Sequence, residues 1–351
     1  MRFSPEVRGR LVTALVAVAV GVACYAIART DPWGEKGSGL PATFSLDLKS
    51  LIQIDPALIG YEQTAEFSVP LKTVRNIAAG AENRIYVAGD RAVLVFSAEG
   101  QQQVSIPLGG EPSCLAVGGA DHATPGRIYV GVEQRIELFE PDGRPAGSWE
   151  VVNENSRLTS IAVAKQDVFV ADAANRLVLR FDTTGKHVGT IGAPDPQRDM
   201  PGFVVPSAFF DIAVDAEELL HVANPGRLRI ETLAFDGQLQ TFWGQASPGL
   251  ADFFGCCNPS QFALLPTGQF VTSEKGIPRV KIYSASGEFE CVVAGPGQLG
   301  VADGEIGDPR ADAGGTVFDV AADRDGRVLV LDQRTNRVRV FTRRETQQEA
   351  T

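Results

Sequence analysis

Apolar and polar residues alternate along most of the chain, in short runs separated by turn residues. The stretch SIAVAKQDVFVADAANRLVLRFDTTGKHVGTIG, residues 160–192, shows the pattern most completely. It holds four apolar runs, which polar residues and glycine interrupt. Alternation with turn signals about every 8 to 12 positions is typical of antiparallel β-strands. The pattern therefore predicts a unit of four antiparallel strands.

The same unit recurs six times from residue 76 onward. An aromatic residue or leucine ends each third strand, and an arginine leads into it. The strand-ending residues are Phe96, Phe139, Phe181, Leu233, Tyr283 and Phe341, and the arginines are Arg91, Arg135, Arg176, Arg229, Arg279 and Arg337. Turn glycines follow the first five copies at Gly100, Gly143, Gly185, Gly237 and Gly287. Six repeated four-stranded units predict an all-β fold, a six-bladed β-propeller.

The sixth copy has no fourth strand, because the chain ends in the polar segment TRRETQQEAT. A strand-like segment, YEQTAEFSVPL at residues 61–71, precedes the first copy. We expect it to close the ring as the outer strand of the sixth blade, since closure removes exposed sheet edges. The propeller then spans residues 61–343, with a linker at 29–60 and a polar tail at 344–351.

Three copies carry a motif that is similar to a known repeat. They read NPSQFALLPTGQFVTSEKGIPRVKIYSASG, SIAVAKQDVFVADAANRLVLRFDTTG and FDVAADRDGRVLVLDQRTNRVRVF. They resemble the NHL repeat, whose pattern is Asn-Pro-x-Gly-Ile-Ala-Val-Asp, an apolar strand, Asp-x-x-Asn-Arg, and a strand ending Phe-Asp-x-x-Gly. The resemblance covers residues 61–343 and implies a six-bladed propeller. It leaves function open, because such propellers include lyases, lactonase relatives, ligand sensors and protein-binding scaffolds.

The first 30 residues differ in character from the rest of the chain. Three arginines precede an uncharged apolar run, LVTALVAVAVGVACYAIA, at residues 11–28. At ~1.5 Å per residue, this run is just long enough to cross a hydrocarbon core about 30 Å thick. We expect a membrane anchor, with residues 1–10 as a cytoplasmic stub and the propeller in the periplasm or outside the cell.

Two alternatives to the anchor stay open. Ala26-Ile27-Ala28 fits the small-x-small pattern of a cleaved signal peptide, which would make the propeller a secreted protein. Cys24 could instead carry a lipid, although Gly21 stands where a lipoprotein signal has an aliphatic residue. All three interpretations place the body outside the cytoplasm, where disulfides persist.

The charge of the chain narrows the choice of partners. The net charge is −11, and the acidic residues are scattered along the chain. A protein that binds nucleic acid needs a basic surface to neutralise phosphates, and this chain has no basic cluster in its sequence. We therefore expect a protein or a small ligand as the partner.

Superposing the six copies aligns one polar position. The residue that opens each innermost strand is Asn76, Cys114, Ser160, Asp211, Gln261 or Asp319. Two positions later, on the same strand face, every copy has alanine: Ala78, Ala116, Ala162, Ala213, Ala263 and Ala321. Innermost strands crowd around the propeller axis, so only small side chains fit there. The alignment predicts an alanine-walled channel with a polar ring at its mouth.

The polar ring has two interpretations. Its groups either hold channel water or form a site for a small ligand or a cation. In the second case Asp211 and Asp319 supply charge, and Asn76, Ser160 and Gln261 supply further polar groups. Hard cations prefer oxygen ligands, although tight sites usually have more than two carboxylates. A metal ion at the channel mouth is thus the candidate cofactor, and its identity stays open.

Three long connections between blades are expected around the same mouth. They are residues 193–209, 244–259 and 295–315. Loops on a rigid scaffold commonly carry binding residues. The second loop contains the adjacent cysteines Cys256 and Cys257, and we expect both it and Cys114 to lie near the mouth.

Three chemistries compete for the adjacent pair. A disulfide between Cys256 and Cys257 would be strained, because neighbouring Cα atoms lie ~3.8 Å apart and disulfides usually span about 4.4 to 6.8 Å. Strained disulfides are easily reduced and often functional. The thiolates could instead bind a soft metal such as copper or zinc, with Cys114 or a carboxylate. Otherwise one thiol pairs with another cysteine, or both are buried; Cys291 is expected in the core.

No catalytic group stands out in the sequence. His122, His187 and His221 do not converge in the repeat alignment, unlike the zinc-binding histidines of peptide-amidating propeller lyases. Glu274, in a turn on the mouth face, could join a lactonase-like metal site, but an acid before the repeat arginine also suits an ion pair that stabilises the turn. Matching turns carry Asp90, Asp172, Asn224 and Asp332.

We therefore expect a membrane-tethered extracytoplasmic propeller that serves as a binding scaffold, within a redox assembly if the cysteine pair is redox-active. Its binding face is the channel mouth together with the Cys256–Cys257 loop. The alternative is a metal-dependent lyase or hydrolase that acts at the channel mouth.

Overall fold

The computed structural model describes residues 5–29, 51–151, 155–198, 201–302, 306 and 317–345. The chain divides into two units, Met1–Leu48 and Lys49–Thr351. In the first unit the described residues form helix α1 (Pro5–Arg29). Its segment Gly9–Ile27 has the length and composition of a membrane span. A signal sequence near the N-terminus has the same length and composition. Most of the predicted linker lies outside the described residues.

The described part of the second unit contains six four-stranded antiparallel sheets, which we number as blades. Blade one is β2 (Val74–Ala79), β3 (Ile85–Gly89), β4 (Ala92–Phe96) and β5 (Gln102–Pro107). Blade two is β6 (Pro112–Val117), β7 (Ile128–Val132), β8 (Arg135–Phe139) and β9 (Pro145–Glu150). Blade three is β10 (Leu158–Val163), β11 (Asp167–Asp172), β12 (Leu177–Asp182) and β13 (His187–Ile191).

The next two blades repeat this order. Blade four is β14 (Ile212–Val214), β15 (Leu220–Asn224), β16 (Arg229–Leu233) and β17 (Leu239–Trp243). Blade five is β18 (Gln261–Leu264), β19 (Phe270–Glu274), β20 (Arg279–Tyr283) and β21 (Phe289–Ala294). Short 3-10 helices in the described connections are Pro56–Leu58, Ala81–Asn83, Pro196–Arg198 and Pro225–Arg227.

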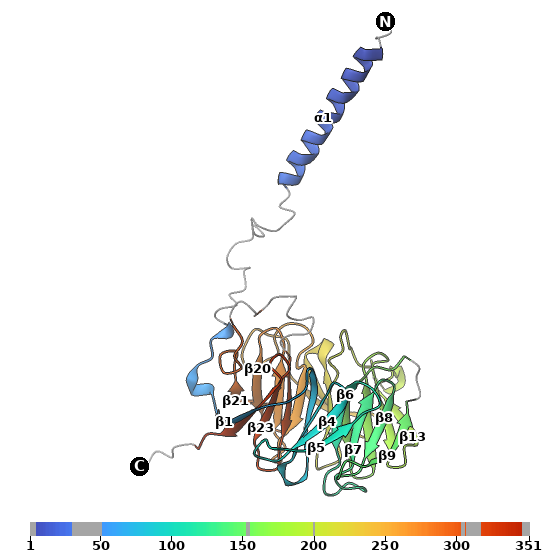
Figure 1. The fold of residues 1–351 in the computed structure, drawn as a ribbon, viewed down its shortest axis with the longest axis vertical. Coiled ribbons are helices and arrows are strands. Elements are labelled where there is room, and N and C mark those ends of the chain that lie inside the picture. The colour runs from blue at the N-terminus through green and yellow to red at the C-terminus, as the bar shows by residue number, and fades with distance from the viewer. Residues whose placement is uncertain are drawn as a thin grey trace. The chain divides into compact units, whose positions relative to one another are not determined.

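Blade six joins the two ends of the propeller. It contains β22 (Phe318–Ala322), β23 (Val328–Asp332) and β24 (Arg337–Arg343), with β1 (Tyr61–Ser68) as its outer strand. Strand β1 pairs with β24 in antiparallel register, with a shift between Gln63 and Ala65. In Figure 1, β1 and β23 belong to opposite ends of the colour bar and lie in one region of the propeller. The predicted ring closure is confirmed.

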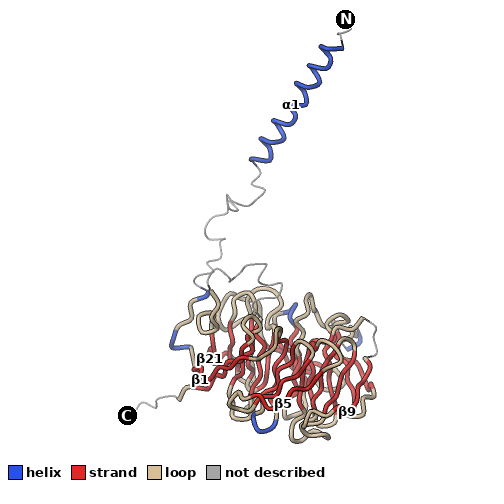
Figure 2. Tube along the Cα trace, in the orientation of Figure 1, coloured by secondary structure: helices blue, strands red, loops and turns tan. Residues whose placement is uncertain are grey.

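The innermost strands form a closed circle. Each contacts the innermost strands of both neighbouring blades, in the order β2, β6, β10, β14, β18, β22 and back to β2. Figure 2 shows the strands of this unit between two layers of loops. Six sheets around one axis make a six-bladed β-propeller, as the repeat pattern predicted.

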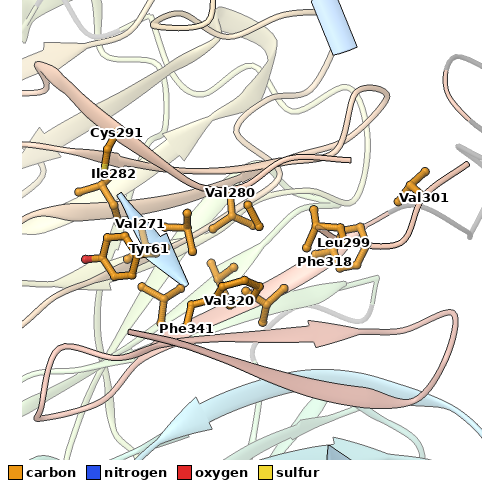
Figure 3. Close-up of a cluster of buried hydrophobic side chains, with 14 of the residues drawn as sticks. Tyr61, Val271, Val280, Ile282, Cys291, Leu299, Val301, Phe318, Val320 and Phe341 are labelled. Carbon is orange, nitrogen blue, oxygen red and sulfur yellow. The ribbon is translucent and has the colours of Figure 1, made fainter. Parts of the chain in front are cut away.

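The core lies between adjacent blades. Six clusters of buried apolar side chains fill the six junctions in the described part of the ring. Burying one such side chain contributes roughly 1.5 to 3 kcal/mol, so these junctions dominate stability. Figure 3 shows the cluster between blades five and six, where Tyr61 from β1 packs with Val271, Ile282 and Phe341. Cys291 belongs to the same cluster, so its predicted place in the core is confirmed.

The repeat landmarks explain why the blades are alike. The aromatic residue or leucine that ends each third strand is buried in all six copies. The five turn glycines have φ between 81° and 89°, a left-handed conformation that side chains disfavour. Each glycine therefore allows the tight turn between the third and fourth strands.

Candidate functional site

A wide depression lies on the face where the innermost strands begin, which we call the mouth face. Its volume is about 1240 Å³. Five blades contribute to its lining, with Arg75, Ser113, Thr159, Gln261 and Gln333 as one example from each. Of the three long loops, the one after blade three reaches it through Ser207, Ala208 and Phe209. Most of the loop after blade five lies outside the described residues.

The predicted alanine-walled channel is present at the centre of the ring. All six predicted alanines line one cavity of about 250 Å³, together with Asn76, Ser160, Asp211 and Asp319. The alignment of the repeat therefore located the axis correctly. Cys114 and Gln261 are absent from this lining in the part of the chain that the structure describes.

The carboxylates of the ring bind the backbone of the next blade. Asp211 Oδ2 accepts the N–H of Phe262 at 2.7 Å, and Asp319 Oδ2 accepts the N–H of Ile77 at 2.8 Å. Ser160 Oγ accepts the N–H of Ile212 at 3.3 Å in the same way. Three of the ring residues thus link the innermost strands of adjacent blades, a role that the sequence analysis did not foresee.

The remaining carboxylate oxygens are also occupied. Asp211 Oδ1 accepts the N–H of Ile212, and Asp319 Oδ1 accepts the N–H of Val320, both at 2.9 Å. Every oxygen of both carboxylates therefore already accepts a backbone N–H group. Two carboxyls that already accept N–H groups and whose pKa values are raised are a weak set of ligands for a hard cation, since tight sites usually use more carboxylates.

Burial changes the protonation of the two carboxyls. Asp211 and Asp319 are buried, and loss of solvent raises the pKa of Asp211 to about 6. Burial, and next the charge of Asp211, raise the pKa of Asp319 to about 8. The N–H donors around both groups act in the opposite direction but do not cancel the effect of burial.

The other ring residues differ from one another. Asn76 Nδ2 donates to Asp319 Oδ2 at 2.5 Å, while Asn76 Oδ1 is buried without a hydrogen-bond partner. Gln261 lines the mouth depression. Cys114 was predicted at the mouth, but its sulfur is fully buried among the side chains between blades two and three. That prediction is wrong, because Gly131 on the paired strand leaves room for the sulfur on that side.

Glu274 is a buried ion-pair residue within blade five. Its carboxylate pairs with Arg279 at 2.5 Å and with Lys281, and all three side chains are almost completely buried. The predicted lactonase-like role is not supported, and the ion pair with the repeat arginine is confirmed here. Asp90 and Asp172 instead accept backbone N–H groups of the chain segment entering each blade, at Thr73 and Arg157.

Hydrogen bonds from blade five and from within the loop hold the loop with the adjacent cysteines, residues 244–259, in place. Lys281 Nζ donates to the carbonyl oxygens of Leu250 and Asp252 at 2.9 and 2.8 Å. Asn258 Nδ2 donates to the Phe254 carbonyl at 2.6 Å. Lys281 was not among the predicted site residues, although a lysine inside the apolar strand RVKIY was the available signal.

The two cysteines have different surroundings. Both are free thiols; Cys256 is exposed, and Cys257 is 4% exposed. Cys257 has φ of 60°, a left-handed conformation that is uncommon outside glycine and indicates that its surroundings hold it there. Burial raises its pKa, while Ser207 and Lys275 lower it. Ser207 also lines the mouth depression, so Cys257 adjoins a residue of that lining, although neither cysteine is itself part of it.

The described residues do not assemble a metal site. No group of three or more histidine, cysteine, aspartate or glutamate side chains converges among them. Two of the histidines have structural hydrogen bonds: His122 contacts Tyr129 Oη at 2.8 Å, and His221 contacts Asp215 at 2.8 Å.

No protein-family model and no curated protein sequence matches the chain. Solved structures do match. The WD40 β-propeller domain of Doa1 has a TM-score of 0.53 and 12% identity, over 82% of this chain and 98% of that one. Virginiamycin B lyase from Staphylococcus aureus, as an inactive variant with quinupristin, has a TM-score of 0.50 and 12% identity, over 79% and 84%. A Bacteroides thetaiotaomicron protein of unknown function has a TM-score of 0.52 and 12% identity, over 80% and 72%. These likenesses show the β-propeller fold alone.

Proposed function

We propose that this protein is a membrane-tethered propeller of the NHL-repeat type, held outside the cytoplasm, whose mouth face binds a protein partner. The mouth depression is the observation that carries the proposal. At about 1240 Å³ it is larger than typical small-molecule pockets of roughly 300 to 1,000 Å³. It is lined by charged and polar side chains from a rigid closed ring. Such a broad polar surface suits a protein better than a small apolar ligand.

The tether rests on the N-terminal sequence. Helix α1 carries an apolar segment that is long enough to span a membrane, and arginines precede it. Arginines at such a position usually stay on the cytoplasmic side, which supports a location of the propeller on the other side. The NHL assignment rests on the repeat motifs, since the structural likenesses support only the fold.

No contact among the described residues favours the lyase or hydrolase alternative. Its nominated carboxylates, Asp211 and Asp319, are engaged by backbone N–H groups, and Glu274 is paired with Arg279. The similarity to virginiamycin B lyase, at 12% identity, concerns the fold alone and does not support a shared chemistry.

Site-directed photo-crosslinking in cells tests the mouth face. A crosslinking amino acid is placed at Thr159, Gln261 or Gln333 in the depression, and at Thr267 or Asp325 in strand-connecting turns away from it. We expect one discrete adduct from the three mouth positions and none from the turns. The exposed Arg157 lies in the same depression, so Arg157→Glu should weaken that adduct at least about tenfold, through a change of charge.

Equal adducts from both sets of positions, or an adduct that Arg157→Glu leaves unchanged, would contradict the proposal. Alkaline carbonate washing of the same membranes tests the tether. The chain should stay in the membrane fraction with its first residues intact, whereas release of a shortened chain would support a cleaved signal peptide.

A further inference from the structure

The adjacent cysteines differ in access to solvent. Cys256 is exposed and Cys257 is buried beside it, joined by a trans peptide bond. Thiol–disulfide exchange needs one sulfur that an external disulfide can reach and a second sulfur close enough to displace it. This pair meets both conditions.

The other propeller cysteines do not meet them. Cys114 and Cys291 are buried in the junction clusters. Burial raises the pKa of Cys114 to about 12 and also raises the pKa of Cys291, so both remain protonated thiols near neutral pH. Exchange chemistry in the propeller is therefore confined to the 244–259 loop.

The pair is also placed where a bound partner would be. Ser207 and Phe209 line the mouth depression, Ser207 adjoins Cys257, and the Lys275 ammonium lies 5.2 Å from the centre of the Phe209 ring. Lys281 and Asn258 hold the loop from the inside. The loop thus presents Cys256 from an anchored base that adjoins a residue of the depression's lining.

We propose that Cys256 and Cys257 form a thiol–disulfide exchange site that reduces a disulfide of the protein bound at the mouth face. This inference rests on the proposed function. Cys256 is the attacking thiol and Cys257 is the resolving thiol.

The exchange balances in two steps. The Cys256 thiolate attacks one sulfur of the partner disulfide, a Cys256–partner disulfide forms, and the second partner sulfur leaves as a thiolate and takes a proton from water. The Cys257 thiolate then attacks Cys256 Sγ and releases the first partner sulfur. The partner gains two electrons and two protons, and the pair becomes a disulfide.

The geometry also explains how the closed pair would be reduced back to two thiols. Neighbouring Cα atoms lie ~3.8 Å apart, below the usual range for disulfides, so the closed pair is strained. Strained disulfides have more oxidising potentials, so the pair reduces only a partner disulfide that is more oxidising still, while a more reducing external dithiol readily reduces the closed pair. An external dithiol therefore restores both thiols, which suits a site that turns over better than a structural cross-link.

The test uses the full chain in detergent, with Cys24→Ser to remove the exposed cysteine of α1, and glutathione disulfide as the probe. Intact mass measures the products. With glutathione disulfide in large excess, so that mass action offsets the strain of the closed pair, we expect the parent to release two glutathione thiols per chain and to lose two hydrogens. Cys257→Ser should retain one glutathione on Cys256, and Cys256→Ser should react at least about tenfold more slowly, because its remaining thiol is buried.

The pH dependence of the second step, in which Cys257 attacks the Cys256–glutathione disulfide, is a second measurement on the chain that keeps both cysteines. The groups that face Cys257 are Cys256, Lys275 and Ser207. Burial has a larger effect on the pKa of Cys257 than any of them, and it raises that pKa. In a chain first converted at low pH to the Cys256–glutathione disulfide, closure should accelerate about tenfold for each unit that the pH is raised, up to the pKa of Cys257.

The proposal is overturned if Cys256→Ser reacts as fast as the parent, or if the parent keeps glutathione without closing at any pH. Because the probe is a small disulfide, such a failure leaves partner binding at the mouth face standing. Conversely, the mouth positions could give no crosslinked adduct while the glutathione exchange proceeds as expected. That result would contradict partner binding at the mouth face and leave the thiol exchange at Cys256 and Cys257 standing.

Discussion

Single side chains decide how the blades are joined. Asp319 receives N–H groups from Ile77 and Val320 and the amide of Asn76, so one carboxylate connects blade six to blade one. Hydrogen bonds to a charged group contribute about 1.5 to 3 kcal/mol each. Yet the pKa of Asp319 is raised to about 8, so it exchanges a proton within the physiological range.

This raised pKa predicts how stability depends on pH. The unfolded Asp319 carboxyl ionises near its ordinary value of 3.8, while the folded one keeps its proton up to about 8. In that window the folded state binds more protons, so the free energy of unfolding falls as pH rises, by up to about 1.4 kcal/mol per unit. Asp211 adds to this decrease in the free energy of unfolding between pH 3.8 and about pH 6, because its pKa is raised in the same way.

Urea unfolding of the full chain from pH 5 to pH 8 measures this effect. Asp319→Asn should flatten the slope between pH 6 and pH 8, because its amide does not titrate. Asp142→Asn is the matched control, since Asp142 is exposed and pairs only with Arg144 at the surface. A slope that persists in Asp319→Asn would show that another group is responsible.

At the scale of elements, strand β1 closes the ring. It brings Tyr61 into the cluster between blades five and six, where this residue is only 2% exposed (Figure 3). The strand also satisfies the outer edge of β24, which would otherwise expose unpaired N–H and carbonyl groups. Closure is thus both an apolar contact and a set of backbone hydrogen bonds.

Tyr61→Ala tests the contribution of this strand. It removes a buried aromatic side chain, so we expect a loss of about 3 to 5 kcal/mol in the free energy of unfolding. The control is Gln63→Ala in the same strand, where the side chain is exposed and the expected change is within about 0.5 kcal/mol. Similar losses in both variants, measured by urea unfolding, would indicate that β1 contributes only through its backbone.

At the scale of the whole molecule, each blade depends on both neighbours. The six junction clusters form a continuous circle, so no described blade has a core of its own. Loss of one junction exposes apolar surface on two blades at once. A closed ring of this kind should unfold as one cooperative unit, in contrast to open repeat arrays.

Two tryptophans report on separate junctions. Trp149 packs against Phe181 at the junction of blades two and three, and Trp243 packs against Tyr283 at that of blades four and five. In a Trp33→Phe background, Trp149→Phe and Trp243→Phe each leave one propeller tryptophan. Because the ring is closed, fluorescence and circular dichroism should then give coincident urea midpoints within each variant. Separate transitions for the two probes would indicate that the blades unfold independently.

Much of the architecture could be predicted from the sequence, because it depends on local periodicity repeated six times. Strand alternation, the turn glycines and the alanine positions all recur at matching places, and superposition of the copies located the channel. The missing fourth strand of the last copy indicated where β1 belongs. These features need no knowledge of contacts between blades.

The roles of the site residues depended on contacts that only the tertiary structure reveals. Asp211 meets the backbone of Phe262 in the next blade, Cys114 turns toward Gly131, and Lys281 reaches the carbonyl of Leu250. The repeat alignment placed each residue on a strand but could not show which neighbour its side chain meets. Side-chain roles here follow from packing between blades, whereas the number and order of blades follow from the chain itself.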